Sequence, residues 1–143
     1  MAIRGYYFSA HWCGPCRNFT PLLISLYNDL RQGGIDKKQF EIFFVSSDRS
    51  REQFDEYFET MPWKDYGFDD KEGKINLVKK FGVRGIPDLV FVDENGNVLI
   101  RNGREVVTEH SKDAQEKQSW SSMWRLLKQK YEQSNDILEK KAV

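Results

Sequence analysis

Hydrophobic and polar positions alternate along the chain in a pattern that predicts four strands and four helices. Short runs rich in aromatic and β-branched residues are typical of buried strands, and they fall at 3–9, 41–47, 89–92 and 98–101. Apolar residues at helical spacing predict helices over 13–32, from Ser50 to Met61, over 75–81 and over 120–131. The predicted order is therefore strand–helix–strand–helix–helix–strand–strand–helix.

This order predicts an α/β fold with one mixed sheet. The first strand–helix–strand unit makes a right-handed parallel pair, and Asn95-Gly96 is a hairpin signal that adds an antiparallel pair. We expect a central four-stranded sheet in the order 2-1-3-4, counted along the chain, with helices on both faces. A single domain is expected over residues 1–131, followed by a polar C-terminal tail, 132–143, that frays.

Composition and charge exclude several classes of protein. The 143 residues fit one domain, and 22 basic against 22 acidic residues leave no electrostatic footprint for nucleic acid or an anionic membrane. No apolar run approaches the roughly 20 residues of a membrane span. The first eight residues lack the apolar stretch of a signal peptide, so we expect a cytoplasmic location, with the nucleus as a second candidate.

The two cysteines carry the candidate chemistry. Cys13 and Cys16 lie where the first predicted strand becomes the first helix, in His-Trp-Cys-Gly-Pro-Cys. The positive end of a helix favours a thiolate at Cys13, and Cys16 faces it from one turn further on, covered by the chain. Such a pair can attack a disulfide with the outer sulfur and resolve the mixed disulfide with the inner one. We expect it to work without a bound metal ion or cofactor.

Three structural interpretations of this pair remain open. A structural disulfide would close a very small loop, which contributes only about 2 kcal/mol by chain entropy. A zinc site needs four ligands, and His11 and His110 are the only histidines in the sequence. Two unrelated buried thiols would rarely fall together at a strand–helix junction.

Two groups of motifs resemble a known family. Trp12-Cys13-Gly14-Pro15-Cys16, Pro21 and Phe81-Gly82-Val83-Arg84-Gly85-Ile86-Pro87 resemble the thioredoxin superfamily. Within it, the chain is similar to the tryparedoxin and nucleoredoxin-like branch. That similarity rests on residues 6–13, 19–23 and 44–48, on Met61-Pro62-Trp63 and on Gly103-Arg104.

The resemblance implies a thioredoxin fold and a role for each residue near the cysteines. Cys13 would be the nucleophile and Cys16 the resolving thiol, while a cis Ile86–Pro87 bond would present the Ile86 backbone to a client strand. The client groove would also include Trp12, Gly14, Pro15 and Pro87, and Trp63 belongs either to this groove or to the core.

One position departs from the thioredoxin pattern. Tyr7 stands where thioredoxins carry a buried aspartate that can accept the proton of the resolving thiol. A tyrosine holds its own proton at pH 7, so it cannot act as that base. The proton must leave to water or to a carboxylate from a neighbouring loop, for which Asp48 and Asp65 are the candidates.

The resemblance implies a thiol–disulfide oxidoreductase that reduces protein disulfides in cellular redox regulation. Its partners would be oxidised client proteins, such as cysteine peroxidases or redox-sensitive transcription regulators, and an upstream reductase or small thiol that supplies electrons. A monomer without direct nucleic-acid or membrane contacts is expected. Two alternatives remain: a regulatory module that binds clients with little turnover, and an oxidant or isomerase of an oxidising compartment.

Overall fold

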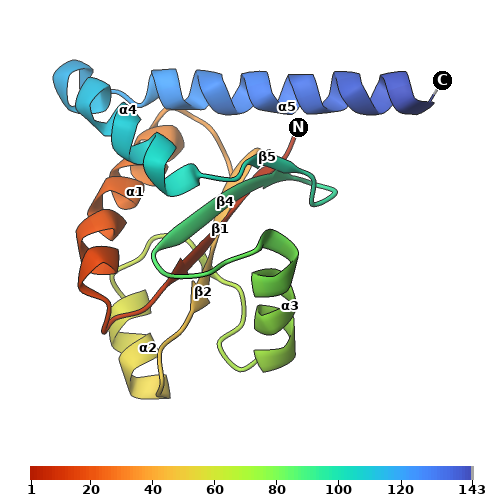
Figure 1. Cartoon of the computed structure of the whole chain (residues 1–143). Helices are drawn as coiled ribbons and strands as arrows, with labels where there is room; N and C mark the ends of the chain where they lie inside the picture. The colour runs from red at the N-terminus through yellow and green to blue at the C-terminus, as the bar shows by residue number, and fades with distance from the viewer. Residues whose placement is uncertain (143) are drawn as a thin grey trace.

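A computed structural model describes residues 1–142, and its elements follow the predicted alternation with two additions (Figure 1). The strands are β1 (Ile3–Ser9), β2 (Phe40–Ser46), β3 (Lys64–Asp65), β4 (Asp88–Asp93) and β5 (Val98–Ile100). The helices are α1 (Gly14–Gln32), α2 (Arg51–Phe58), α3 (Lys71–Phe81), α4 (Gly103–Lys117) and α5 (Ser121–Ala142). Within residues 1–142, no helix combines the length and the apolar character of a membrane span.

The sheet has the order β3-β2-β1-β4-β5. β1 pairs in parallel with β2 from Ile3 opposite Phe40 to Ser9 opposite Ser46, and it pairs antiparallel with β4 on its other side. The four predicted strands are β1, β2, β4 and β5, and their predicted order is confirmed. The additional strand β3 is only two residues long, so it has no alternating pattern by which the sequence could reveal it.

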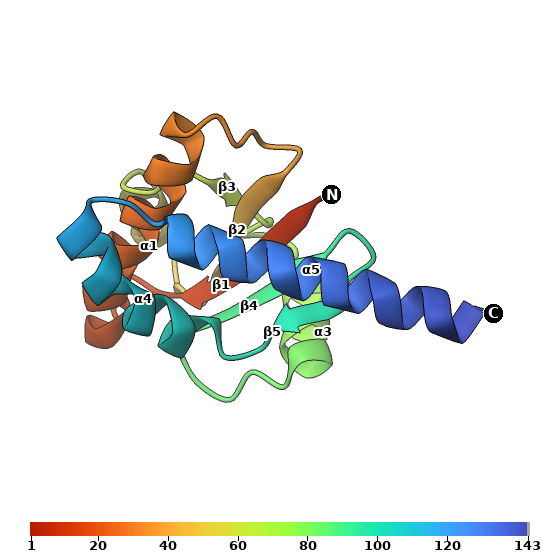
Figure 2. The same cartoon turned by 90° about the horizontal axis from the view of Figure 1, so that it is seen from above.

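Strand alternation divides the core into two unequal layers. Tyr7, Phe44 and Phe91 point to the face covered by α1, α2, α4 and α5, where most of the buried apolar side chains lie. Phe8, Val45 and Val90 point to the other face, where α3 packs. Figure 1 shows α1 and α4 on one side of the sheet and α3 on the other, and Figure 2 shows α5 crossing above them. Helices on both faces are therefore confirmed.

Helix α4 is absent from the sequence-based prediction, and its composition explains why. Val107 is the only large apolar residue that it buries, and the other buried residues are Gly103, Ser111 and Ala114. Their spacing is helical, but a single valine among small residues gives no apolar stripe. α4 nevertheless packs closely on β4, because the missing side chain of Gly103 lets the backbone of α4 approach Leu89.

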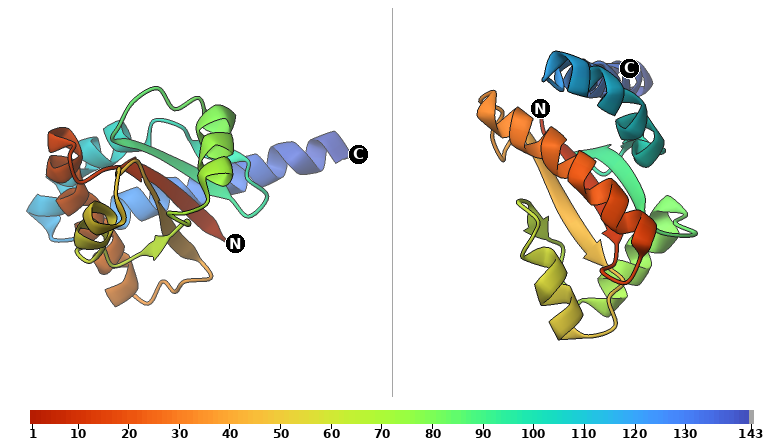
Figure 3. Two further views of the ribbon diagram at one scale, coloured as in Figure 1. Left: turned by 90° about the horizontal axis from the view of Figure 1, so that it is seen from below. Right: turned by 90° about the vertical axis from the view of Figure 1, so that its left-hand side faces the viewer.

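The last helix is longer than predicted. The expected stripe of Trp120, Trp124, Leu127 and Tyr131 is buried. However, α5 continues beyond Glu132 to Ala142, so the expected frayed tail is helical in the structure. This C-terminal half extends past the body of the protein (Figure 3, left). The division of the chain into a domain and a tail at residue 131 stays a prediction.

The topology brings the cysteine segment to one end of the sheet. β1 and β2 run in parallel, so both end beside the start of α1 (Figure 3, right). β2 runs parallel to β1 and β4 runs antiparallel to it, so the loop that follows β2 and the segment that precedes β4 both lie at this end, beside the cysteines. Three loops that are far apart in sequence therefore converge on Cys13.

We expect Gly103→Ala to destabilise the protein by about 1–3 kcal/mol, because a methyl group would overpack the α4–β4 contact. An added Cβ would lie 2.7 Å from the Leu89 carbonyl oxygen and 2.8 Å from its Cγ. Urea unfolding measures the effect. Gly85→Ala is the matched control, because nothing lies within 4 Å of an added Cβ there. Equal stability of the two variants would contradict the close α4–β4 approach.

Candidate active site

Cys13 is the N-cap of α1. Its Sγ accepts a hydrogen bond from the backbone N–H of Cys16 at 3.2 Å, and the sulfur therefore lies at the positive end of the helix. Gly14 and Pro15 form the first helical positions, where a proline is well tolerated because its missing N–H has no partner there. This arrangement lowers the free energy of a thiolate at Cys13 relative to a thiol.

Cys13 and Cys16 are joined in a disulfide. Cys13 is 7% exposed and Cys16 is completely buried, so an incoming molecule reaches the Cys13 sulfur first. The two sulfurs pack with Ala10 and with the side chain of Ile86 in a small apolar cluster. The more accessible cysteine is thus Cys13, the predicted nucleophile, and the inaccessible one is Cys16, the predicted resolving thiol.

Ile86 and Pro87 form the opposite wall of the site. Their peptide bond is cis, as predicted, and the Ile86 carbonyl oxygen lies 3.8 Å from Cys13 Sγ. Pro87 directly precedes β4, whose pairing with β1 holds this segment against the start of α1. A backbone acceptor from the start of β4 therefore lies next to the reactive sulfur.

Trp12 lies on the surface beside the disulfide. The residue is 47% exposed, its Nε1–H donates to the Ser47 carbonyl oxygen at 3.1 Å, and the Arg49 guanidinium lies 4.9 Å from the ring centroid. The loop after β2 therefore fixes the orientation of the indole. An exposed, fixed aromatic ring next to the reactive sulfur is suited to contact a client.

Asp48 ties the same loop to the cysteine segment. Its carboxylate accepts from the His11 backbone N–H at 2.7 Å and from the Ser46 hydroxyl at 2.8 Å. The His11 ring stacks on Tyr57 with its centroid 5.4 Å away, and its Nδ1 lies 4.0 Å from Glu56. Asp48 thus acts in the structure as a hydrogen-bond acceptor that positions the loop before Cys13.

Four buried hydroxyl groups form a network beneath the first turn of α1. The Thr20 hydroxyl donates to the Cys16 carbonyl oxygen at 2.9 Å, and it lies 2.6 Å from the Tyr7 hydroxyl and 2.7 Å from that of Tyr57. Ser9 continues the network, 2.8 Å from the Tyr57 hydroxyl. A consistent arrangement has Tyr7 and Tyr57 donating to Thr20 and Ser9 donating to Tyr57.

Burial raises the pKa of the Tyr7 hydroxyl well above its ordinary value, and the neighbouring Tyr57 adds to the effect. Tyr7 therefore holds its proton at neutral pH. The sequence singles out Tyr7 but not Thr20, Tyr57 or Ser9. The sequence does place two of these residues near Tyr7 and Cys16: Thr20 lies four residues after Cys16, on the same helix face, and Ser9 shares the strand face of Tyr7.

Trp63 is part of the core, and the two candidate bases make no hydrogen bond to Cys16 among the described residues. Trp63 is 4% exposed and packs edge-on against Tyr7 and Tyr27, so its burial favours the core over the client groove. Asp65 belongs to β3, which pairs with the far side of β2, and one of its oxygens accepts from the Phe68 N–H. Within residues 1–142, no hydrogen bond joins Asp48 or Asp65 to Cys16.

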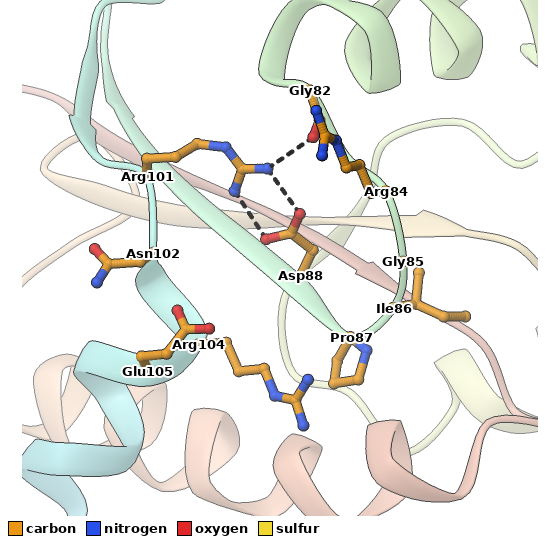
Figure 4. Close-up of a pocket in the computed structure, with 10 residues that line it drawn as sticks. All are labelled: Gly82, Arg84, Gly85, Ile86, Pro87, Asp88, Arg101, Asn102, Arg104 and Glu105. Atoms are coloured by element: carbon orange, nitrogen blue, oxygen red, sulfur yellow. Dashed lines mark hydrogen bonds and ion pairs between the residues drawn. The ribbon is translucent and has the colours of Figure 1, made fainter.

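A pocket of about 540 Å³ opens beside Ile86 and Pro87 (Figure 4). Across it, Arg101 binds Asp88 through two hydrogen bonds of 2.9 Å and donates to the Phe81 carbonyl oxygen at 2.7 Å. The start of α4 supplies Asn102, Arg104 and Glu105 to the lining. The sequence points to Arg104 only through the resemblance, and it gives no signal for the pairing of Arg101 with Asp88.

Comparison with known proteins identifies thioredoxin-like relatives. A family model described as thioredoxin-like matches residues 2–98. Probable nucleoredoxin 1 of Arabidopsis thaliana is 47% identical over 110 residues, and human nucleoredoxin is 44% identical over 100 residues. These matches cover 77% and 70% of this chain but only 18% and 22% of the relatives, so the chain spans about a fifth of their length.

Solved structures extend the similarity to the fold. Tryparedoxin II complexed with glutathionylspermidine is 38% identical with a TM-score of 0.70, and the match covers 79% of this chain and 76% of that one. Tryparedoxin I from Leishmania major is 32% identical with a TM-score of 0.71, covering 80% and 77% of the two chains. With its Cys13–Cys16 pair, the chain belongs to the thioredoxin-like family, in the tryparedoxin and nucleoredoxin branch of thiol–disulfide oxidoreductases.

Proposed function

We propose that the protein is a protein-disulfide reductase. The observation that supports this best is the position of the Cys13 sulfur, which caps α1 and lies 3.8 Å from the Ile86 carbonyl oxygen. The helix end favours the thiolate that must attack, and the Ile86 backbone offers a client strand a hydrogen-bond acceptor at the point of attack. The half-exposed Trp12 supplies contact area on the other side of the sulfur.

The proposed reaction moves two electrons from the dithiol to the client. The Cys13 thiolate attacks one sulfur of the client disulfide, forms a mixed disulfide and releases the other client sulfur as a thiolate. Cys16 then loses its proton and attacks Cys13 Sγ. This step forms the Cys13–Cys16 disulfide and releases the second client thiolate, and protonation completes the client dithiol. A separate reductase or a small thiol then reduces the pair.

The proton of Cys16 leaves without a buried carboxylate. Tyr7 occupies the position beneath Cys16, and its raised pKa makes it a donor and not a base. Its partner Thr20 binds the Cys16 carbonyl oxygen, so the network orients the turn and leaves the proton transfer to water or to the departing client thiolate. The client can thus accept the proton that its own reduction requires.

Clients, electron donor and location are part of the same proposal. Oxidised proteins such as cysteine peroxidases or redox-sensitive transcription regulators fit a site with one accessible sulfur and a backbone acceptor. A glutathione-like thiol is a candidate donor, because a similar tryparedoxin was solved with glutathionylspermidine. Similarity to nucleoredoxins supports a location in the cytoplasm and the nucleus.

Insulin reduction with dithiothreitol as electron donor tests the activity. We expect turnover well above the Cys13→Ser control, because only Cys13 is accessible for attack.

Cys16→Ser should accumulate mixed disulfides with client proteins, because the resolving thiol is missing, whereas Cys13→Ser should accumulate none. Turnover equal to that of Cys13→Ser would favour a client-binding module, and alkylation of Cys16 before Cys13 in the reduced protein would reverse the two roles.

Tyr7→Phe tests the role of the hydroxyl network. The variant keeps the ring but loses one donor, and Thr20 still binds the Cys16 carbonyl oxygen. We expect a loss of about 1 kcal/mol in stability and disulfide reduction within about threefold of the wild type.

The pH profile of the Tyr7→Phe variant between about pH 6 and 9 should match that of the wild type, because the raised pKa of Tyr7 keeps the hydroxyl protonated over this range. A loss of tenfold or more with an intact fold, or a shifted profile, would assign the hydroxyl to proton transfer instead.

A further inference from the structure

Helix α3 leaves two large apolar side chains exposed on one of its faces. Phe81 is the one residue of α3 that is buried, whereas Ile75 and Val78 are 53% and 37% exposed. The two exposed residues lie three positions apart, so they are neighbours on the helix surface. Large apolar side chains that gather on a surface indicate a site of contact. Packing within the fold therefore does not account for this part of the apolar pattern.

Ile75 and Val78 form one wall of a groove of about 440 Å³ between α3 and the end of β2. The buried side chains of Phe8 and Val45 form its floor, on the face of the sheet where α3 packs (Figure 1). The groove shares no lining residue with the pocket in Figure 4. Pockets that hold small organic ligands have volumes of about 300–1,000 Å³, so this groove has room for one.

Every charged side chain that lines the groove is a lysine: Lys71, Lys74 and Lys79. Lys74 is held within the fold, because its Nζ donates to the Ser46 carbonyl oxygen at 3.1 Å. Lys71 and Lys79 are exposed, and neither forms an ion pair with any residue that the structure describes. No acidic residue stands three or four positions from either of them, so α3 places no carboxylate beside these two ammonium groups.

The acidic residues around the groove accept hydrogen bonds from the backbone or pair with an arginine. These residues are Asp48, Asp65, Asp69 and Asp70. Three of them, Asp48, Asp65 and Asp69, also act on the charge of Lys74. Glu72 is exposed, but it does not line the groove. A molecule inside the groove therefore meets lysines, and Lys71 and Lys79 are the two that it can bind.

Three main-chain groups at the end of β2 already have hydrogen-bond partners. The Ser46 carbonyl oxygen accepts from Lys74, and the Ser47 N–H donates to the Ser9 carbonyl oxygen at 2.9 Å. The Ser47 carbonyl oxygen accepts from the Trp12 indole. A peptide strand in the groove would leave its own polar groups unpaired against these atoms, whereas an alkyl chain needs no such partners. The groove therefore suits an alkyl chain better than a polypeptide.

We propose that this groove binds a free medium-chain fatty acid. The alkyl chain lies along Ile75 and Val78 above the apolar floor, and the carboxylate binds Lys71 or Lys79 at the rim. An ammonium group and a carboxylate form a charge-assisted hydrogen bond, and the methylene groups of the lysine stems add apolar contact. The site is separate from the reactive disulfide, so the proposal does not depend on the reductase function.

Calorimetric titration of the full chain with octanoate and decanoate, below their micelle concentrations, tests the site. We expect one molecule to bind per chain, and decanoate to bind about tenfold more tightly than octanoate, because two more methylene groups leave water. Octyltrimethylammonium, which carries the opposite charge on the same chain, should bind at least about tenfold more weakly than octanoate, because the rim is lined by lysines.

Substitutions of exposed residues separate the apolar wall from the rim. Ile75→Gln should weaken decanoate binding about tenfold, because it places a polar group along the chain. Ile137→Gln is the matched control, because Ile137 is an equally exposed isoleucine of α5, at 54%, and it should leave binding unchanged.

The double variant Lys71→Gln/Lys79→Gln should weaken decanoate binding about tenfold and leave the binding of neutral 1-octanol unchanged, because only the carboxylate needs the ammonium groups. Lys112→Gln/Lys130→Gln is its control, since it removes the same charge from exposed positions outside the groove. Backbone amide chemical shifts locate the ligand, and decanoate should move those of Ser47, Ile75 and Val78.

Four results would overturn the proposal. Shifts confined to other parts of the chain would place the ligand elsewhere, and equal losses in Ile137→Gln or in Lys112→Gln/Lys130→Gln would show non-specific binding. Equal affinity for octyltrimethylammonium would remove the role of the lysines. Displacement of decanoate by a tighter-binding leucine-rich acidic peptide would assign the groove to a protein. Insulin reduction is measured separately, so none of these results bears on the reductase function.

Discussion

The hydrogen bond from the Cys16 N–H to the Cys13 sulfur is the interaction on which the site depends. It makes the reactive atom itself the cap of α1, so the charge that the helix end favours is the charge that the chemistry needs. This requires a short connection between β1, which ends at Ser9, and α1, and the parallel pairing of β1 with β2 brings the supporting loop to the same end. Asp48 then fixes the backbone at His11, two residues before the sulfur.

Beneath this turn the protein uses neutral hydroxyl groups where a charge would be costly. A buried carboxylate must be paired or change its protonation state, and it would couple the fold to pH. Tyr7, Thr20, Tyr57 and Ser9 satisfy one another and the Cys16 carbonyl oxygen, so no buried donor in the group is left without a partner. The turn is held in the same way whether or not Cys16 has lost its proton, which suits a residue that alternates between thiol and disulfide.

The sequence predicts the parts of this design that have strong local signals. β1, α1 and the cysteine pair combine an apolar run, a helical stripe and a motif within a few residues, and the Asn95-Gly96 turn specifies the β4–β5 hairpin. β3 and α4 are missed because one is two residues long and the other buries small side chains. The hydroxyl network joins β1, α1 and α2, and only the folded chain brings those three elements together.

The arginine arrangement shows why whole-chain charge is a poor guide to binding. Equal numbers of acidic and basic residues give a formal charge of zero, and this argues against a broad surface of one charge. The charges exposed at one site depend instead on which residues pair within the fold. Arg101 engages Asp88 within the fold, whereas Arg84, Arg104 and Glu105 of the same pocket make no ion pair among the described residues. The charges that a ligand meets beside Ile86 and Pro87 are therefore decided by pairing within the fold and not by the net charge of the chain.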